Sequence, residues 1–142
     1  MSKKIRGFFA SKIMRCGADE NIQKGAVFNP LCELGDYSGI GENCILNGPV
    51  TIGKNVIMGP ECVFFTKNHM FSRTDIPIRL QGYTETKPII IEDDVWIGQR
   101  VIVLPGVHIG EGSIIGAGSV VTKDIPPFVV AAGNPARIVK HR

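Results

Sequence analysis

Three histidines are the side chains of this sequence best suited to move a proton near neutral pH. His69 lies in the segment FFTKNHMFSRTDIPIRLQGYTETKP, residues 64–88, which is rich in polar and basic groups. His108 stands inside a regular apolar pattern where an exposed surface position is expected, and His141 is the penultimate residue. An imidazole that removes a proton from a hydroxyl or an amine makes that group a nucleophile. Taken alone, His69 is more often an incidental residue of a surface loop, and the C-terminal sequence described below shifts the prediction to a general base.

Other chemistries that these residue types suggest are not supported by their spacing. A zinc site with three histidines needs all three on neighbouring turns of the chain, but His108 comes far after His69 in the sequence and no third histidine is near. The run of glycines from Gly110 to Gly118 is spaced G-x-G-x-x-x-G, with no lysine followed by serine or threonine. The sequence therefore predicts neither a bound metal nor a site for a nucleoside triphosphate or dinucleotide.

The elements that must position His69 follow from a repeat in which every sixth residue is a large apolar one. A helix would repeat near 3.6 residues and an antiparallel strand at about 2, so neither explains this period. Short strands that turn at three corners do explain it, and three hexads then form one coil of about 18 residues. The large apolar residues of the repeat are Ile22, Phe28, Leu34, Ile40, Leu46, Ile52, Met58 and Phe64, followed by Ile91, Ile97, Val103, Ile109, Ile115 and Val121.

Two further positions of the hexad support the repeat. Small or β-branched residues stand four positions after the large ones, among them Cys32, Cys44 and Cys62. With no C-x-x-C pair present, we expect these three to be core residues, with Cys44 and Cys62 stacked one coil apart, whereas Cys16 lies outside the clear repeat and is left open. The residue directly after the large one is often glycine, which suits a corner with positive φ. These glycines are Gly35, Gly41, Gly53, Gly59, Gly98, Gly110 and Gly116.

Stacking about six such coils predicts an all-β fold, a parallel β-helix with the large apolar residues along its axis. The repeat is interrupted between Phe64 and Ile91, whose separation is not a whole number of hexads. The second half is therefore out of phase with the first, and an insertion must leave the solenoid here. We divide the chain into an N-terminal segment at 1–21, a β-helix domain at 22–132 with a loop insertion at about 70–84, and a C-terminal extension at 133–142.

Composition limits the classes of partner. With 44% apolar and 20% charged residues, the 142-residue chain resembles an ordinary globular domain. The net charge of +3 is too small to indicate nucleic-acid binding, and no basic run is interleaved with aromatic residues. No stretch approaches the roughly 20 apolar residues of a membrane span. Lys12 and Arg15 interrupt the only N-terminal apolar stretch, so we expect a cytoplasmic protein without a signal peptide.

The N-terminal sequence MSKKIRGFFASKIMRCG is compatible with two structures. The favoured one is a terminal segment that packs on the domain, and the other is a short helix that touches a membrane surface. The second rests on the combination of Phe8, Phe9, Ile13 and Met14 with Lys3, Lys4 and Arg6.

The C-terminal sequence IEDDVWIGQRVIVLPGVHIGEGSIIGAGSVVTKDIPPFVVAAGNPARIVKHR resembles that of the hexapeptide-repeat acetyltransferases, which use acetyl-coenzyme A. The segments DDVWIG, IGAGSVVTKDIP and AGNPAR carry the resemblance, and the likeness extends over roughly residues 22–140. It implies a left-handed β-helix, acetyl-CoA as the acyl donor, no metal, and a homotrimer with active sites between subunits.

The same resemblance implies roles for individual residues. His69 would be the general base in a direct transfer, because no cysteine is placed to carry the acetyl group. A backbone N–H near Gly98 or Gln99 would stabilise the oxyanion, and Asn47 and Asn68 would orient the substrate or the base. The implied coenzyme contacts are Gly98 and Ala117 through their backbone, Trp96 as an apolar wall, and Thr122, Lys123 and Arg137 for the phosphates.

The loop NHMFSRTDIPIRLQG is most similar to that of acetyltransferases from surface-polysaccharide gene sets, so the expected acceptor is a sugar hydroxyl on a glycan precursor. Arg73, Asp75, Arg79 and Gln81 are candidate acceptor contacts. An N-acetyltransferase acting on an amino-sugar nucleotide, a serine O-acetyltransferase and a non-catalytic β-helical scaffold remain as alternatives. His69 does not separate O-transfer from N-transfer, because an amine acceptor also needs a base.

Overall fold

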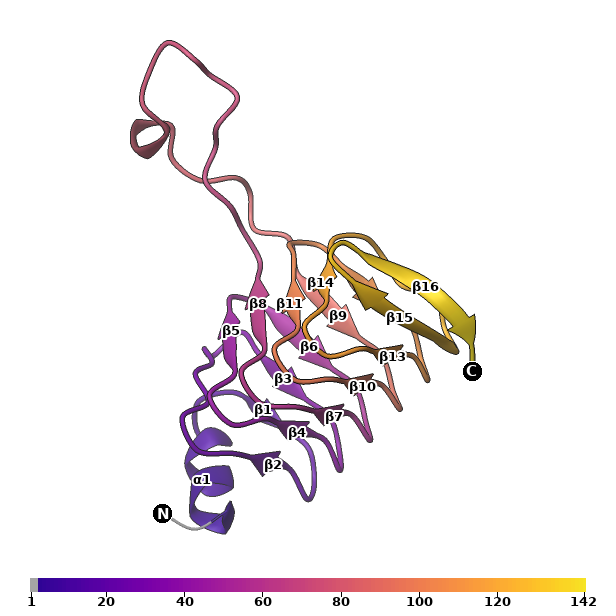
Figure 1. Ribbon diagram of the computed structural model, residues 1–142. Coiled ribbons are helices and arrows are strands. Elements are labelled where there is room, and N and C mark those ends of the chain that lie inside the picture. Colours follow the sequence, from indigo (N-terminus) through magenta and orange to yellow (C-terminus); the bar gives the residue numbers. More distant parts are fainter. Residues whose placement is uncertain (1–2) are drawn as a thin grey trace.

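The protein is a triangular prism of stacked coils from which one arm projects, in a computed structural model that describes residues 3–142 (Figure 1). Met1 and Ser2 of the N-terminal segment lie outside the described residues. The strands are parallel within each face of the prism apart from the last one. Partners on neighbouring coils are separated by three hexads of sequence, as between Glu33 and Thr51. This arrangement confirms the expected fold class.

The three faces are named here A, B and C in the order in which the chain visits them. Face A contains β1 (Arg15–Cys16), β3 (Glu33–Leu34), β6 (Val50–Ile52), β9 (Ile89–Ile91) and β12 (His108–Ile109). Face B contains β2 (Asn21–Ile22), β4 (Gly39–Ile40), β7 (Ile57–Met58), β10 (Trp96–Ile97), β13 (Ile114–Ile115) and β15 (Val129–Gly133). Face C contains β5 (Ile45–Asn47), β8 (Val63–Phe65), β11 (Ile102–Val103) and β14 (Val120–Val121).

The core runs along the prism axis and is built from the two predicted inward positions of the hexad. All the large residues of the repeat are buried except Phe28, which is half-buried. Each such side chain removed from water contributes about 1.5–3 kcal/mol. The expected stacking of Cys44 and Cys62 is confirmed, since the backbone N–H of Cys62 lies 3.3 Å from Cys44 Sγ. Cys16 is half-buried, and like the other cysteines it is a free thiol.

The prediction that the glycine after each large apolar residue has positive φ is wrong. Positive φ occurs two residues later, at Tyr37, Asn55 and Arg100 for example, and at Gly106 and Gly118 in the second half of the chain. The glycine is required for a different reason, because neighbouring coils approach each other most closely there. A Cβ on Gly59 would lie 2.7 Å from the backbone nitrogen of Gln99, and one on Gly98 would lie 2.6 Å from that of Ala117.

The arm, residues 66–88, leaves the prism after β8 and returns to it at β9 (Figure 1). Val63 and Ile102 are partners on adjacent coils although their separation in the sequence is more than twice that of ordinary partners, so the insertion is longer than one whole coil. The arm's two strands are held to each other by backbone hydrogen bonds from Lys87 to Thr66, from Thr84 to Asn68 and from Met70 to Gly82. The tip contains a short 3-10 helix, η1 (Ile78–Leu80), and none of its residues is buried.

Both ends of the prism are closed by elements that do not follow the repeat. At the N-terminal end, helix α1 (Lys3–Ala10) packs on the first coil. At the C-terminal end, β16 (Ala136–His141) turns back and pairs antiparallel with β15. These elements cover backbone groups and core side chains that the first and last coils would otherwise expose. No helix among the described residues is both long and apolar enough to cross a membrane.

Candidate active site

A pocket of about 580 Å³ opens at the corner where face C meets face A, directly below the arm. Asn47 comes from the end of β5, Phe65 from the end of β8, and Leu31 from the coil before them. Lys67, Asn68 and His69 come from the outgoing strand of the arm and Tyr83 from the returning strand. The pocket therefore forms where the repeat breaks, because the inserted residues replace the wall that the next coil would have provided.

His69 is held against the returning strand of the arm by Tyr83. The two residues are antiparallel bridge partners, and their rings lie 4.3 Å apart between centroids with an angle of 32° between the planes. The ammonium group of Lys67 lies 4.6 Å from the centroid of the Tyr83 ring on the same arm. Because the aromatic contact limits the rotation of the imidazole, Tyr83 and the backbone bridge together fix the direction in which His69 points.

Asn47 and Asn68 line this pocket together with His69. Thr66 connects the first residues of the arm to the prism, since its buried hydroxyl donates a hydrogen bond of 2.5 Å to the backbone oxygen of Asn47 in β5. The backbone N–H of Asn68 lies 3.1 Å from the hydroxyl of Thr84, which fixes the foot of the arm. The pocket thus has polar groups on a rigid corner beside the exposed apolar side chains of Leu31 and Phe65.

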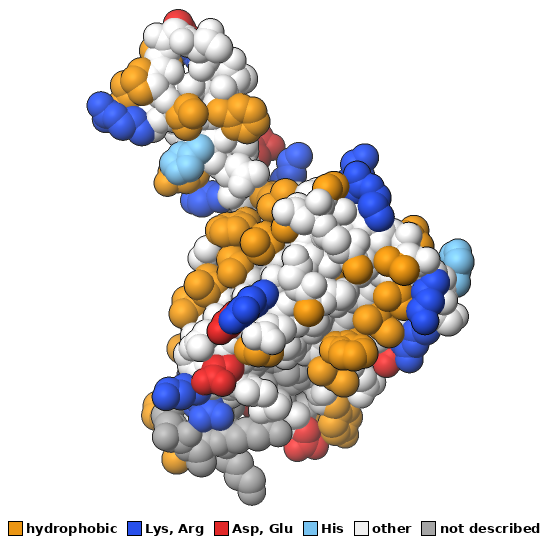
Figure 2. Space-filling view, viewed as in Figure 1, with side chains coloured by type: hydrophobic (Ala, Val, Ile, Leu, Met, Phe, Trp, Pro, Cys, Tyr) orange, Lys and Arg blue, Asp and Glu red, His pale blue; other side chains and the backbone are white. Residues whose placement is uncertain are grey.

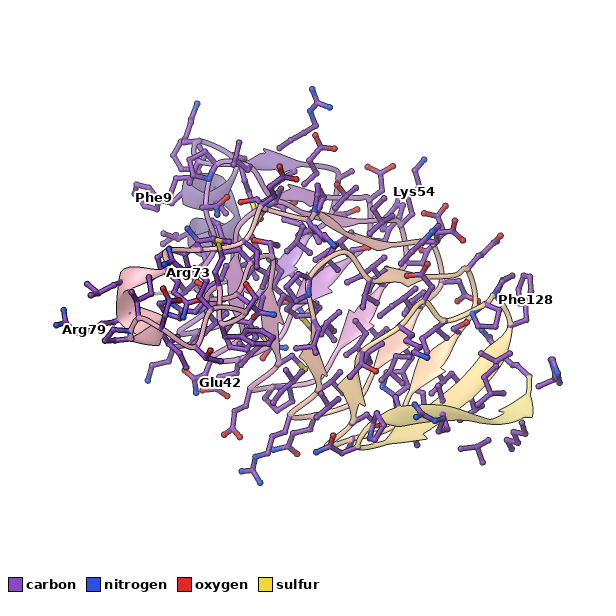
Figure 3. All side chains as sticks on the ribbon, turned by 90° about the horizontal axis from the view of Figure 1, so that it is seen from above. Phe9, Glu42, Lys54, Arg73, Arg79 and Phe128 are labelled. Carbon is purple, nitrogen blue, oxygen red and sulfur yellow. The ribbon has the colours of Figure 1, made fainter. Side chains whose placement is uncertain are left out.

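The four acceptor candidates in the arm lie outside this pocket. Arg73 pairs with Asp75, and Gln81 donates to the backbone oxygen of Arg73 at 2.8 Å and accepts from its N–H at 3.1 Å. These three residues hold the tip of the arm together. Arg79 is exposed in η1, and Figure 3 shows it pointing away from the prism.

The residues expected to contact the coenzyme divide between two corners of the prism. Gly98 and Ala117 lie one coil apart at the corner between faces B and C, and Arg137 reaches the same corner because it pairs with Ala132 of β15. Trp96 faces outward from β10 on face B, where it lines a shallow pocket with Asp94 and Arg142, and it is 53% exposed. Ala117 is exposed and carries only a methyl group, so its backbone is accessible to a ligand.

Thr122 and Lys123 lie at the other corner, between faces C and A. The register aligns Val121 with Val103 and Phe64, so Thr122 follows the same line as Phe65 of the pocket, two coils further along. Two coils correspond to about 10 Å. Both side chains are exposed. Within one chain, face C separates Thr122, Lys123 and His69 from Gly98, Ala117 and Arg137.

Face C is apolar on its outer surface as well as on its inner one. Its outward residues form a single ladder in register, and all are β-branched aliphatic side chains that are half-buried or exposed. These residues are Val27, Ile45, Val63, Ile102 and Val120. Parallel strands that are apolar on both sides are usually covered on both sides.

His108 lies on the outer surface of face A, away from the pocket, as its place in the repeat indicated. Its Nε2 is 2.9 Å from a carboxylate oxygen of Glu92. The other oxygen of Glu92 accepts the backbone N–H of Glu111 at 2.7 Å. These contacts, with the N–H bond the larger influence, lower the pKa of Glu92. Among residues 3–142, no group of three His, Cys, Asp or Glu side chains is placed to hold a metal ion.

Sequence reasoning missed Tyr83, Lys67 and Leu31 as pocket residues. Tyr83 is separated from His69 by the irregular sequence of the arm's tip, so no periodicity connects them. One feature of the sequence could have indicated it. An insertion that leaves and re-enters the prism at one corner must bring its two strands together where they join the prism, so the residues before β9 lie opposite those after β8.

Comparison with known proteins agrees with this architecture. The sequence profile described as "Bacterial transferase hexapeptide (six repeats)" matches residues 88–123. A hexapeptide-repeat containing acetyltransferase from Vibrio cholerae, solved as a complex with acetyl coenzyme A, superimposes with a TM-score of 0.91 at 32% identity, covering 99% of this chain and 78% of that one. A maltose O-acetyltransferase from Clostridium difficile superimposes with a TM-score of 0.87 at 33% identity, covering 97% and 75%.

Among curated sequences, the galactoside O-acetyltransferase of Escherichia coli is 47% identical over 92 residues, which are 65% of this chain and 44% of that enzyme. The chain spans about half the length of the curated relatives that it matches.

Proposed function

The chain belongs to the family of hexapeptide-repeat acetyltransferases, and on this basis we propose that it is an acetyl-coenzyme A dependent O-acetyltransferase whose acceptor is a hydroxyl of a sugar. The observation that carries the proposal is the pocket of about 580 Å³ in which His69 lies beside Asn47 and Asn68. We place the reaction in the cytoplasm, in the synthesis of a surface glycan precursor. Four free thiols are compatible with that reducing compartment.

His69 acts as the general base in this proposal. Its imidazole accepts the proton of the acceptor hydroxyl while the hydroxyl oxygen attacks the acetyl carbonyl, and it returns that proton to the departing thiolate. Such a base contributes about 10²- to 10⁴-fold in rate. Stacking of Tyr83 on the imidazole of His69 keeps this ring in one orientation. Less orientational entropy is then lost when the transition state forms.

Acetyl-CoA supplies an activated acetyl thioester, and the residues at the two corners fit its chemistry. Ala117 is exposed and leaves its backbone accessible to an extended, amide-containing chain, and Trp96 offers an exposed apolar surface on the same face of the prism. Lys123 and Arg137 are exposed cations suited to phosphate groups in a partly hydrated site. The backbone N–H of Gln99 is the proposed oxyanion donor, because that of Gly98 already donates to the backbone oxygen of Ile115 at 2.8 Å.

A single protomer does not bring these groups together, so the proposal includes a homotrimer. In a threefold arrangement with face C toward the axis, the C–A corner of one protomer meets the B–C corner of the next. His69 and Lys123 of one chain then face Gly98 and Ala117 of its neighbour. The apolar outer ladder of face C supports this arrangement, since the neighbouring protomers would cover it.

The trimer is tested by complementation between two inactive variants. His69→Ala removes the base at one corner, and Ala117→Phe blocks the other corner with a bulky side chain at an exposed position. When the two are co-expressed in equal amounts, about a quarter of the sites combine two intact corners and activity returns to about that fraction. Activity that stays at background in mixed trimers would show that both corners of a site belong to one chain.

The reaction is tested by thiol release from acetyl-CoA with galactosides, amino sugars and serine as acceptors. We expect turnover with sugar hydroxyls and a loss of about 100-fold or more in His69→Ala. His108→Ala is the matched control, because its ring pairs with Glu92 on face A, far from the pocket, and its activity should equal that of the unmodified protein. Turnover only with amines refutes O-transfer, and a fully active His69→Ala protein refutes the role of the base.

A further inference from the structure

Helix α1 is oriented with its large apolar side chains toward solvent. Its buried face consists of Gly7, Ala10 and, just beyond the helix, Met14. Phe8 and Phe9 are 60% and 56% exposed, and their rings contact each other edge to face with centroids 5.7 Å apart. Ile5 in the helix and Ile13 just beyond it are also about half exposed. Two adjacent exposed phenylalanines form an apolar surface that the prism itself leaves uncovered.

The inward side explains this orientation. A Cβ on Gly7 would lie 2.6 Å from a carboxylate oxygen of Glu20, so the narrow glycine and alanine side of the helix lies close against the first coil. Arg6 anchors the helix by donating from Nε to the backbone oxygen of Ile22 at 2.8 Å. The phenylalanines are therefore directed outward by packing on the opposite side, and Figure 3 shows Phe9 projecting from the ribbon of α1.

The same end of the molecule has a concentrated positive charge. Residues 1–15 contain five of the 16 Lys and Arg residues and none of the 13 Asp and Glu residues. The rest of the chain has more acidic than basic side chains, so the net positive charge of the protein comes entirely from this segment. Lys12 holds its ammonium group 5.4 Å from the centroid of the Phe8 ring, whereas the guanidinium group of Arg15 pairs with Glu33 at 3.4 Å.

We propose that the outward face of α1, formed by Ile5, Phe8, Phe9, Lys12 and Ile13, docks on the surface of an anionic lipid bilayer. Aromatic rings insert at the boundary between headgroups and acyl chains, while lysine and arginine stay at the level of the lipid phosphates. Within residues 1–20 the five Lys and Arg residues outnumber Asp19 and Glu20, and this excess of positive charge favours an anionic lipid surface as the occupant. Figure 2 shows basic side chains at this end of the prism, with acidic side chains beside them and some hydrophobic ones at the edge.

One short helix binds a membrane weakly, so the oligomeric state determines the strength of attachment. In the proposed trimer, three parallel prisms present three α1 helices at the same end, and their binding to one surface is cooperative through high effective concentration. The docking of α1 itself does not depend on the acetyl-transfer chemistry.

The test is co-sedimentation of the full chain with vesicles. Vesicles of phosphatidylcholine containing about 30% phosphatidylglycerol should bind the protein, and vesicles of pure phosphatidylcholine should bind it at least tenfold more weakly. Raising the salt concentration from about 0.05 M to about 0.5 M should release it. The double variant Phe8→Ser/Phe9→Ser and the single variant Lys12→Glu should each bind the anionic vesicles at least tenfold more weakly.

Phe71→Ser is the matched control, because Phe71 is a 72% exposed phenylalanine on the arm and its replacement should not change vesicle binding. Thermal melting of each variant checks that the prism remains folded. Equal binding by the unmodified protein and the double variant overturns the proposal, as does equal binding to neutral and anionic vesicles. A smaller particle mass for the double variant overturns it in favour of a contact between copies of the chain. Acetyl transfer to a soluble acceptor should be unaffected, which separates this result from a failure of the proposed enzyme activity.

Discussion

Replacing Gly98 by alanine tests the rule that neighbouring coils meet at the residue after each large apolar side chain. The added methyl group would lie 2.6 Å from the backbone nitrogen of Ala117, 2.9 Å from its Cα and 2.9 Å from the backbone oxygen of Ile115. All three atoms belong to the backbone, so no flexible side chain can move aside. Overpacking of this kind costs about 1–3 kcal/mol. For a chain of this length, that corresponds to a decrease in melting temperature of about 3–10 °C.

The measurement is urea or thermal unfolding at one fixed protein concentration, because unfolding of the proposed trimer would depend on concentration. A companion kinetic measurement is the KM for acetyl-CoA, which should rise because the same coils form the proposed coenzyme corner. Tyr37→Gly is the matched opposite change. Tyr37 has φ of 59°, which costs a residue with a Cβ about 1–2 kcal/mol, so glycine there should leave the protein as stable or more stable.

The reasoning is refuted if Gly98→Ala unfolds at the same urea concentration as the unmodified protein. It is also refuted if Tyr37→Gly is destabilised as strongly as Gly98→Ala, since the two kinds of corner position would then not differ in what they require.

Three further outcomes follow from the described contacts. Tyr83→Leu removes a ring contact worth about 0.5–1.5 kcal/mol, so kcat should fall about 2- to 12-fold with little change in KM. Tyr83→Phe keeps the ring and should keep the original kcat. Steady-state kinetics of the two variants test this. Burial, and secondarily the charge of Glu20, raises the pKa of Cys16 to about 11. Because the thiolate is the reactive form, iodoacetamide should alkylate Cys16 at pH 8 at least about tenfold more slowly than free cysteine, as measured by mass spectrometry. The pKa of Glu92 is lowered in the folded state, so the ionised carboxylate stabilises the protein at pH values above the usual glutamate range. This stabilisation is lost as the pH falls through the lowered pKa. The difference in melting temperature between the unmodified protein and Glu92→Gln should therefore shrink toward acid pH.

The candidate site was accessible to sequence reasoning only where it coincides with the repeat or with its interruption. His69 stood out because it lies where the period of six ends, and its role as a base, like those of Asn47 and Asn68, came from the family resemblance. Tyr83 was not identified, because its position opposite His69 depends on how the arm folds back on itself. The roles of Arg73, Asp75 and Gln81 also depend on that folding, since in the arm they bind one another.

The sequence by itself determined the coil, its core and the location of the insertion, because each depends on a local property, the size of every sixth side chain, that repeats along the chain. Tertiary structure alone decided which corner each functional residue occupies, that the glycines serve close approach of coils and not positive φ, and that Phe8 and Phe9 point outward. These features arise between residues that are distant in the sequence, such as Gly7 and Glu20 or Val63 and Ile102. Their contacts are set by closure of the coils and by the length of the arm, which no periodic pattern encodes.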